Sequence, residues 1–257
     1  MDDTSKLESL AQSLRTKLIK GVRQRLRHWG FQENGEVEEA PEEIEGGYIF
    51  RGEVYSDPGV PKKWKALKGA IGDHGLKYVA EEAAYTWFNR LMALRILEKN
   101  GHISKTVGYA EDTSQPAVLY GVKQSGVPEI AGGEKEDVQK AIKDSNDDRA
   151  FRHLLIGVCQ ENSLLSSVFG RVDDFTELLL PEGLLQPGGI AEEIATTGAI
   201  SEEDFGQVEL IGWLYQFYIS EKKDAVYDQS GKFQPEDIPA ATQIFTPRWI
   251  VRYMVEN

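Results

Sequence analysis

The strongest pattern of apolar and polar positions lies at the start of the chain. Between Ser5 and Trp29, apolar side chains recur three or four residues apart, which is the spacing of one face of an α-helix. These positions are Leu7, Leu10, Leu14, Leu18, Val22, Leu26 and Trp29. Gly30 follows, and glycine is a common residue just beyond a helix C-terminus. The pattern predicts an amphipathic helix over residues 5–29 with this stripe buried.

Two stretches rich in aromatic and aliphatic residues predict the main helices of the body. Residues 76–100 are apolar on more than one face, which is typical of a helix packed on several neighbours, and Gly101 marks their end. Residues 207–224 predict a second helix of this kind. Its expected buried residues are Leu210, Ile211, Leu214, Phe217 and Tyr218. Shorter helices are predicted at residues 134–144, 147–162, 173–180 and 190–197.

β-Structure is predicted at one place, residues 48–55 (YIFRGEVY), as a small hairpin or edge strand. Asp57-Pro58-Gly59 should end it with a turn. The acidic residues 31–47 before it predict a loop or connector with little regular structure. The Gly- and Pro-containing residues 103–133 after it predict loop with short strand or helix pieces. The expected fold is therefore mainly α, a bundle of several helices with a small β element.

These patterns divide the chain into four parts. We expect a basic amphipathic helix at residues 1–30, an acidic connector with the small β element at 31–60, and a helical domain at 61–242. Residues 243–257 form a separate terminal segment.

Charge is distributed unevenly along the 257 residues. The net charge of −13 argues against nonspecific binding of nucleic acid by the surface as a whole, yet residues 1–30 carry seven Lys and Arg against three Asp and Glu. The single cysteine, Cys159, excludes an internal disulfide, and no apolar run approaches the ~18 residues that a membrane span requires. We expect a cytoplasmic protein that does not contact membranes.

The first basic cluster that is a candidate for DNA contact lies on the polar side of residues 5–29. Arg23, Arg25 and Arg27 are spaced so that they could follow a phosphate backbone. The alternative is a solvated face whose charge is balanced by the glutamates between residues 36 and 45.

The second basic cluster surrounds a tryptophan. Its members are Lys62, Lys63, Trp64, Lys65 and Lys68. Cationic side chains beside an aromatic ring are suited to stacking on or beside a base. In the alternative interpretation Trp64 belongs to the buried stripe of a short helix, together with Leu67 and Ile71, and the lysines are solvated.

The terminal segment QIFTPRWIVRYMVEN, residues 243–257, predicts the start of a helix. Thr246 is a suitable N-cap and Pro247 suits the first helical position. The following apolar residues recur at helical spacing, so one face of this helix needs a partner that the segment does not supply.

This segment resembles motif X of the gamma-class adenine-N6 DNA methyltransferases, the helix that opens their catalytic domain and contacts S-adenosylmethionine. Two further blocks in the same order, AYTWFNRLMALRILEKNG (residues 84–101) and LIGWLYQFYISEKKDAVY (residues 210–227), are similar to the BREX phage-defence methyltransferases of the PglX family. The resemblance covers most of the chain and is weakest around residues 31–60 and 103–150.

The resemblance implies a parent enzyme that transfers a methyl group from S-adenosylmethionine to adenine N6 at a specific site in double-stranded DNA and marks host DNA as self. Only Phe245, Thr246 and Pro247 match the cofactor motif. The chain lacks the Gly-rich cofactor turn, the polar-Pro-Pro-aromatic loop for a flipped base, a Ser/His/Asp arrangement and a Cys/His metal pattern. We therefore expect no catalytic residue, no metal and no bound cofactor in this chain, which should be inactive alone and should open an absent α/β domain.

Two alternatives remain from other classes. The chain could be a non-catalytic module that binds DNA or other BREX defence components. It could also be a regulatory subunit that a separately encoded catalytic chain completes.

Overall fold

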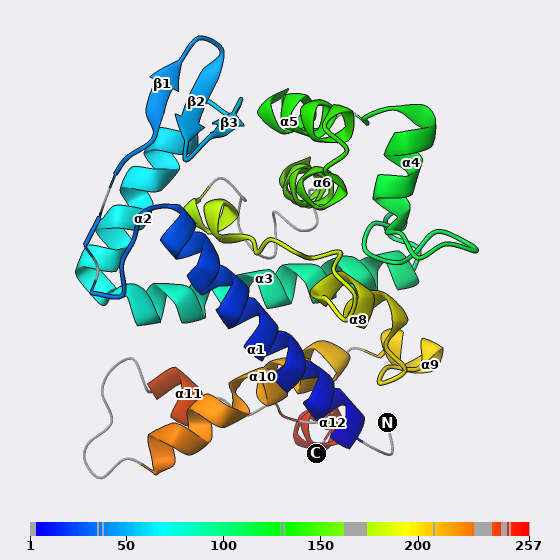
Figure 1. Ribbon diagram of the computed structural model, residues 1–257. Coiled ribbons are helices and arrows are strands. Elements are labelled where there is room, and N and C mark those ends of the chain that lie inside the picture. The colour runs from blue at the N-terminus through cyan, green and yellow to red at the C-terminus, as the bar shows by residue number, and fades with distance from the viewer. Residues whose placement is uncertain are drawn as a thin grey trace. The chain divides into compact units, whose positions relative to one another are not determined.

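The computed structural model describes residues 4–34, 36–37, 39–128, 130, 132–161, 174–207, 209–228, 238–242, 246 and 248–256. Within these ranges the chain is mainly helical with one small antiparallel sheet, as predicted (Figure 1). Contacts group it into a larger unit, residues 16–196, and a smaller unit, residues 1–15 with 197–257.

Helix α1, Ser5–His28, confirms the first predicted helix and contributes to both units. All seven residues of its apolar stripe, from Leu7 to Trp29, are buried. Gly30 has a φ of 85° and donates to Arg27 O, while the Phe31 N–H reaches Leu26 O. This pair of bonds satisfies two carbonyls at the helix end and requires the left-handed conformation that glycine adopts readily.

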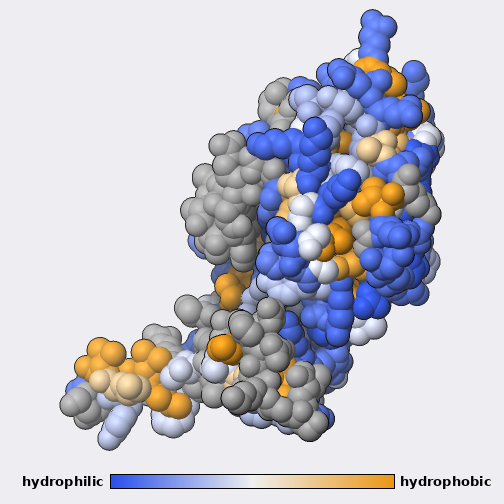
Figure 2. Space-filling view, turned by 90° about the vertical axis from the view of Figure 1, so that its left-hand side faces the viewer, coloured by the Kyte–Doolittle hydropathy of each residue, from blue (hydrophilic) through white to orange (hydrophobic). Residues whose placement is uncertain are grey.

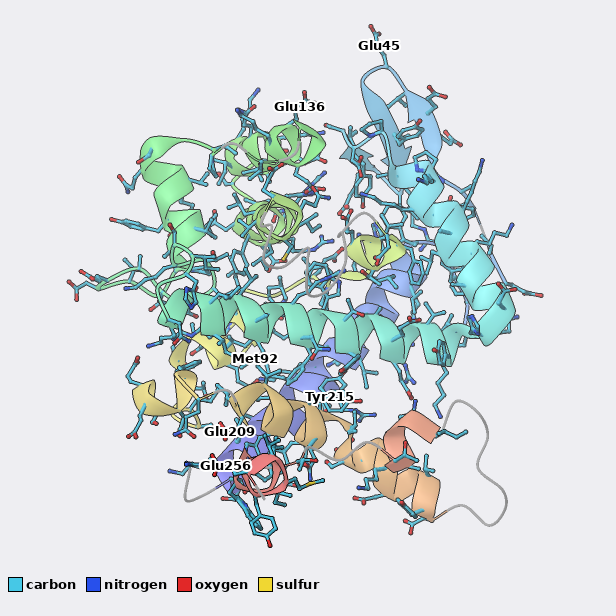
Figure 3. All side chains as sticks on the ribbon, turned by 180° about the vertical axis from the view of Figure 1, so that it is seen from behind. Glu45, Met92, Glu136, Glu209, Tyr215 and Glu256 are labelled. Atoms are coloured by element: carbon cyan, nitrogen blue, oxygen red, sulfur yellow. The ribbon has the colours of Figure 1, made fainter. Side chains whose placement is uncertain are left out.

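The sheet has three short strands in the order β1 (Glu42–Ile44), β2 (Gly47–Phe50) and β3 (Glu53–Tyr55). The predicted hairpin is β2–β3, with Tyr48 opposite Tyr55. The expectation of little regular structure in residues 31–47 is wrong at β1, because this acidic strand pairs through its backbone while Glu42 and Glu43 stay exposed. Figure 3 shows Glu45 at the tip of the β1–β2 turn.

The described residues of the larger unit also form several helices. They are α2 (Val60–His74), α3 (Leu76–Lys99), α4 (Ala117–Ser125), α5 (Gly132–Lys143), α6 (Asp147–Glu161), the 3-10 helix η1 (Phe175–Leu179) and α8 (Ile190–Thr196). Helices α5 and α6 lie side by side (Figure 1). Helix α4 lies within residues 103–133, where the sequence predicted loop with short strand or helix pieces; its nine residues bury only Leu119 and Val122, so their periodicity is too weak to place the helix.

The short helix η1 is a centre of hydrogen bonding in the larger unit. The indole N–H of Trp29 donates to Leu178 O, and that of Trp87 donates to Thr176 O, each at 2.7 Å. Arg90 on α3 donates to the Thr176 hydroxyl at 2.8 Å. The first residue of the predicted helix 173–180 lies outside the described residues; Asp174 accepts from Thr176 N. These bonds satisfy the polar atoms of bulky side chains that the core buries.

Glu98 holds the loop that follows α3. Its buried carboxylate accepts the backbone N–H groups of Thr106, Val107 and Gly108 at 2.7 to 3.2 Å and pairs with Arg95. A Cβ at Gly108 would lie 2.3 Å from the Arg95 guanidinium, so a larger residue there would displace the Arg95 side chain from its pair with Glu98.

Besides the first part of α1, the described residues of the smaller unit form three short helices and one long one. They are α9 (Glu202–Phe205), α10 (Glu209–Tyr227), α11 (Ile238–Thr242) and α12 (Arg248–Glu256). Leu210, Leu214 and Tyr218 are buried as predicted, but Ile211 is 56% exposed, so its predicted burial is wrong. Arg15 on α1 contacts two residues of α10: its guanidinium lies over the Tyr218 ring and pairs with Glu221.

Helix α12 presents large apolar side chains to solvent. Tyr253 is 67% exposed, Trp249 71%, Met254 74% and Val255 79%. Figure 2 shows hydrophobic residues gathered at its lower left, where this helix lies. Among the described residues, no helix is long and apolar enough to cross a bilayer.

Candidate nucleic-acid interface

Helix α2 separates the lysine cluster into an exposed part and a buried part. The turn at Asp57 starts the helix, with the Gly59 N–H donating to the Asp57 carboxylate at 2.7 Å. Val60, Trp64, Leu67 and Ile71 then fall on one buried face. Lys62, Lys65 and Lys68 lie on the exposed side. The helical period therefore decides which members of the cluster a phosphate can reach.

Lys63 and Trp64 lie in the interior. The Lys63 ammonium donates to Asp57 at 2.6 Å and also pairs with Glu177. The Trp64 indole donates to Trp29 O at 3.1 Å. Trp64 thus occupies the buried stripe that the alternative interpretation of the sequence described, and neither side chain is exposed to a base or a phosphate.

The exposed lysines of α2 form an open cationic row. Lys68 places its ammonium 5.8 Å from the centre of the Trp64 ring. Lys62 and Lys65 make no ion pair with any residue in the described ranges. Unpaired, exposed lysines can neutralise phosphates without first breaking a bond within the protein.

The arginines of α1 occupy three different environments. Arg27 is exposed and pairs with Glu33 at 2.8 Å, whereas Arg23 is half-buried. Arg25 is only 1% exposed; it donates to Leu178 O at 3.2 Å and pairs with Glu182. The expectation that all three share a solvated polar face is therefore wrong for Arg25, because η1 and Glu182 after it contact this side chain.

A buried acidic cluster lies beneath α2. Oxygens of Asp57, Glu134 and Glu177 come within 4.8 Å of one another, close enough to share a metal ion. The Lys63 ammonium, however, already binds two of these carboxylates and supplies a cation. The sequence did not indicate this cluster, because Lys63 and Glu177 are 114 positions apart.

Burial also changes the protonation of the cluster. Desolvation raises the pKa of Glu134 to about 8 and the pKa of Glu177 to about 7, although Lys63 acts against both shifts. His153 lies 2.7 Å from Glu134, and burial lowers the pKa of His153 to about 3. At neutral pH Glu134 is protonated and His153 is neutral, so the two side chains share one proton across this contact. The buried carboxylates are thus compensated by the charge of Lys63 and by this proton.

Of the three residues that match the cofactor motif, the structure describes Thr246, which is exposed and lies two positions before α12. Phe245 and Pro247 lie outside the described residues.

Comparison with known proteins identifies similar sequences over nearly the whole chain. No family model matches it. The chain is 36% identical over 262 residues to an adenine-specific methyltransferase BrxX from Escherichia coli O9:H4 (strain HS), and 32% identical over 280 residues to an adenine-specific methyltransferase PglX from Lacticaseibacillus casei (strain Zhang). Both alignments cover 99% of this chain, which spans 21% and 23% of the length of those relatives. The chain is therefore homologous to part of the BREX-type adenine-specific methyltransferases of the PglX family, the family that its sequence resembles.

Proposed function

We propose that this chain is the N-terminal helical portion of a site-specific DNA adenine-N6 methyltransferase of a BREX phage-defence system. The alignment of 99% of the chain with two adenine-specific methyltransferases carries the proposal. The parent enzyme takes its methyl group from S-adenosylmethionine and marks host DNA as self. The chain itself supplies no catalytic residue, since its sequence lacks the polar-Pro-Pro-aromatic loop that such chemistry uses.

Within the parent enzyme, α12 and the residues before it connect this portion to the catalytic domain. The exposed side chains of Trp249, Tyr253, Met254 and Val255 support this assignment, because an apolar surface on one short helix is typical of an interface. Phe245, Thr246 and Pro247 contact S-adenosylmethionine in the assembled protein.

DNA contact is assigned to those members of the two basic clusters that are not buried. Lys62, Lys65 and Lys68 on α2 bind phosphates, with Arg23 and Arg27 as further contacts. Arg25, Lys63 and Trp64 instead stabilise the fold, because each is buried with a partner inside the protein. Phosphate contacts of this kind position DNA without reading its sequence.

The test of the DNA assignment is the salt dependence of DNA binding by the intact enzyme. Replacing Lys62, Lys65 and Lys68 together by Gln should weaken binding and reduce the slope of log K against log salt by about 0.9 for each lost phosphate contact. Lys143→Gln, at the exposed end of α5, is the control and should leave the slope unchanged. An unchanged slope in the triple variant would refute the α2 contacts.

The exposed apolar face of α12 also favours a second candidate, a non-catalytic module that binds another BREX component. The gene sequence after the codon for Asn257 distinguishes the two candidates. A polar-Pro-Pro-aromatic motif in the same polypeptide supports the enzyme, and a stop codon there supports the module.

A further inference from the structure

A second surface feature of the larger unit lies apart from the lysines of α2. It is a cleft of about 580 Å³ between the start of α6, the loop that contains Tyr109 and Pro116, and the loop of residues 182–186. Its volume lies in the range of small-molecule sites. Arg149 and Arg152 on α6 are its cationic lining residues.

Arg152 is a buried cation that lacks sufficient partners. It is 6% exposed, and among the described residues no hydrogen bond reaches its guanidinium, whose Nε is buried without a partner. Its ion pair with Glu182 spans 3.8 Å, beyond hydrogen-bond length, because the same Glu182 oxygen already accepts from Arg25. Burial and the nearby charge of Arg25 lower the pKa of Arg152 to about 10. A buried guanidinium in this state favours an added anion.

Arg149 provides a second donor in the same cleft. One of its terminal nitrogens donates to Val54 O at 2.6 Å and lies 4.0 Å from Asp137, while its Nε is buried without a described partner. Both arginines project from the first two turns of a 15-residue helix, whose positive end also favours an anion.

The acidic residues of the cleft limit the charge of the ligand. Asp148 is held by the Gly183 and Leu185 N–H groups, Asp147 pairs with Lys123, and Glu53 accepts from Tyr55. These bonds keep the carboxylates in place, so a ligand with several negative charges would meet repulsion on entering. A single negative charge meets less of this repulsion and still pairs with the unsatisfied donors of the two arginines.

We propose that this cleft binds a small molecule through one singly charged oxyanion, a carboxylate or a phosphodiester, which takes the unsatisfied donors of Arg152 and Arg149. Planar guanidinium groups suit both oxyanions, since each offers two oxygens to a pair of N–H donors. The uncharged amide side chains of Gln115 and Gln186, which also line the cleft, are available to the remainder of the ligand.

The test uses acetate, dimethyl phosphate, sulfate and chloride as probes at constant ionic strength. In ¹H–¹⁵N spectra of the chain, the Nε–H signal of Arg152 is identified by its loss in Arg152→Met. Acetate or dimethyl phosphate should shift it saturably and raise the melting temperature by mass action. Arg152→Met should lose the rise, Arg152→Lys should weaken it several-fold, and the exposed control Lys20→Gln on α1 should keep it.

A second readout separates ligand binding from a purely structural role. Without a binding anion, Arg152→Met should melt no lower than the wild type, because the change removes an uncompensated buried charge. The proposal is overturned if Arg152→Met melts far lower while no probe affects the wild type, or if all variants respond equally. A stronger response to sulfate or to a DNA oligonucleotide than to acetate and dimethyl phosphate would overturn the proposal that the ligand is a small molecule with one negative charge.

Discussion

Lys63 and Glu177 form an ion pair inside the larger unit, and Asp57 shares the same ammonium. The sequence suggested Lys63 as a surface contact for DNA. In the structure Lys63 instead joins α2 to η1. The pairing carries a stability prediction, because each partner depends on the other for compensation of its buried charge.

Replacing Lys63 by Met removes the cation that Asp57 and Glu177 share. Loss of one member of a buried ion pair typically costs about 3–5 kcal/mol, so we expect a loss of this size in the free energy of unfolding. Urea denaturation at pH 8, where Glu177 with its pKa of about 7 is ionised, measures it. The exposed neighbour variant Lys62→Met should change stability by less than about 0.5 kcal/mol, and equal losses in the two variants would refute the ion pair.

Glu134 predicts a dependence of stability on pH. Its pKa is raised from 4.5 to about 8, so the folded state binds more protons than the unfolded state within that window and stability falls as pH rises through it. His153, with its pKa lowered to about 3, acts in the opposite direction, but only below its ordinary value of 6.5. The free energy of unfolding should therefore decrease between pH 6.5 and 8.

The variant Glu134→Gln should reduce this decrease, because a glutamine does not ionise. Glu136→Gln on the same helix is the control, since Glu136 is exposed and its side chain is labelled on α5 in Figure 3. Denaturant midpoints measured at half-unit steps of pH decide the matter; parallel profiles for the wild type and Glu134→Gln would contradict the assignment.

Glu98 predicts local order in the loop after α3. Glu98→Gln retains the shape of the side chain but removes the charge that three backbone N–H groups share, and hydrogen bonds to charged groups contribute about 1.5–3 kcal/mol each. We expect faster hydrogen exchange at residues 106–108 and lower stability. Glu111→Gln, on an exposed carboxylate of the same loop, should leave both unchanged, and protected amides in Glu98→Gln would argue against the role of Glu98.

The exposure of α12 predicts that changes on its apolar face will reduce function without reducing stability. Replacing Trp249 and Val255 by Ser should leave the unfolding free energy of the chain within about 0.5 kcal/mol of wild type, because both side chains are exposed. In the intact enzyme the same changes should lower methyltransferase activity, since the proposed interface loses its apolar residues. A large loss of stability in the isolated chain would show that α12 packs within it.

The sequence predicted those elements whose burial follows a period along the chain. Helices α1 and α3 have continuous apolar stripes, so their ends were correct to within one or two residues. Strand β1 and helix α4 carry little or no such pattern, because their positions depend on backbone pairing and on two buried side chains. A period of hydrophobicity cannot reveal elements of this kind.

Site residues were harder to predict than helices, because burial of a charged residue depends on distant partners. Arg25 and Arg27 are two positions apart and chemically identical, yet Arg25 is buried against Leu178 and Glu182 while Arg27 remains exposed. The cleft at Arg152 joins residues from β3, α6 and two loops, and no local motif marks it.

Methyl transfer to adenine tests the central proposal most directly. The protein produced from the complete gene and the 257-residue chain should each be incubated with DNA and isotopically labelled S-adenosylmethionine, and cofactor binding by the chain should be measured by calorimetry. The complete protein is expected to place label on adenine N6, and the chain alone to transfer nothing and to show no submicromolar affinity for the cofactor. Adenine methylation or submicromolar cofactor binding by the chain alone, or no methylation by the complete protein, would contradict this account.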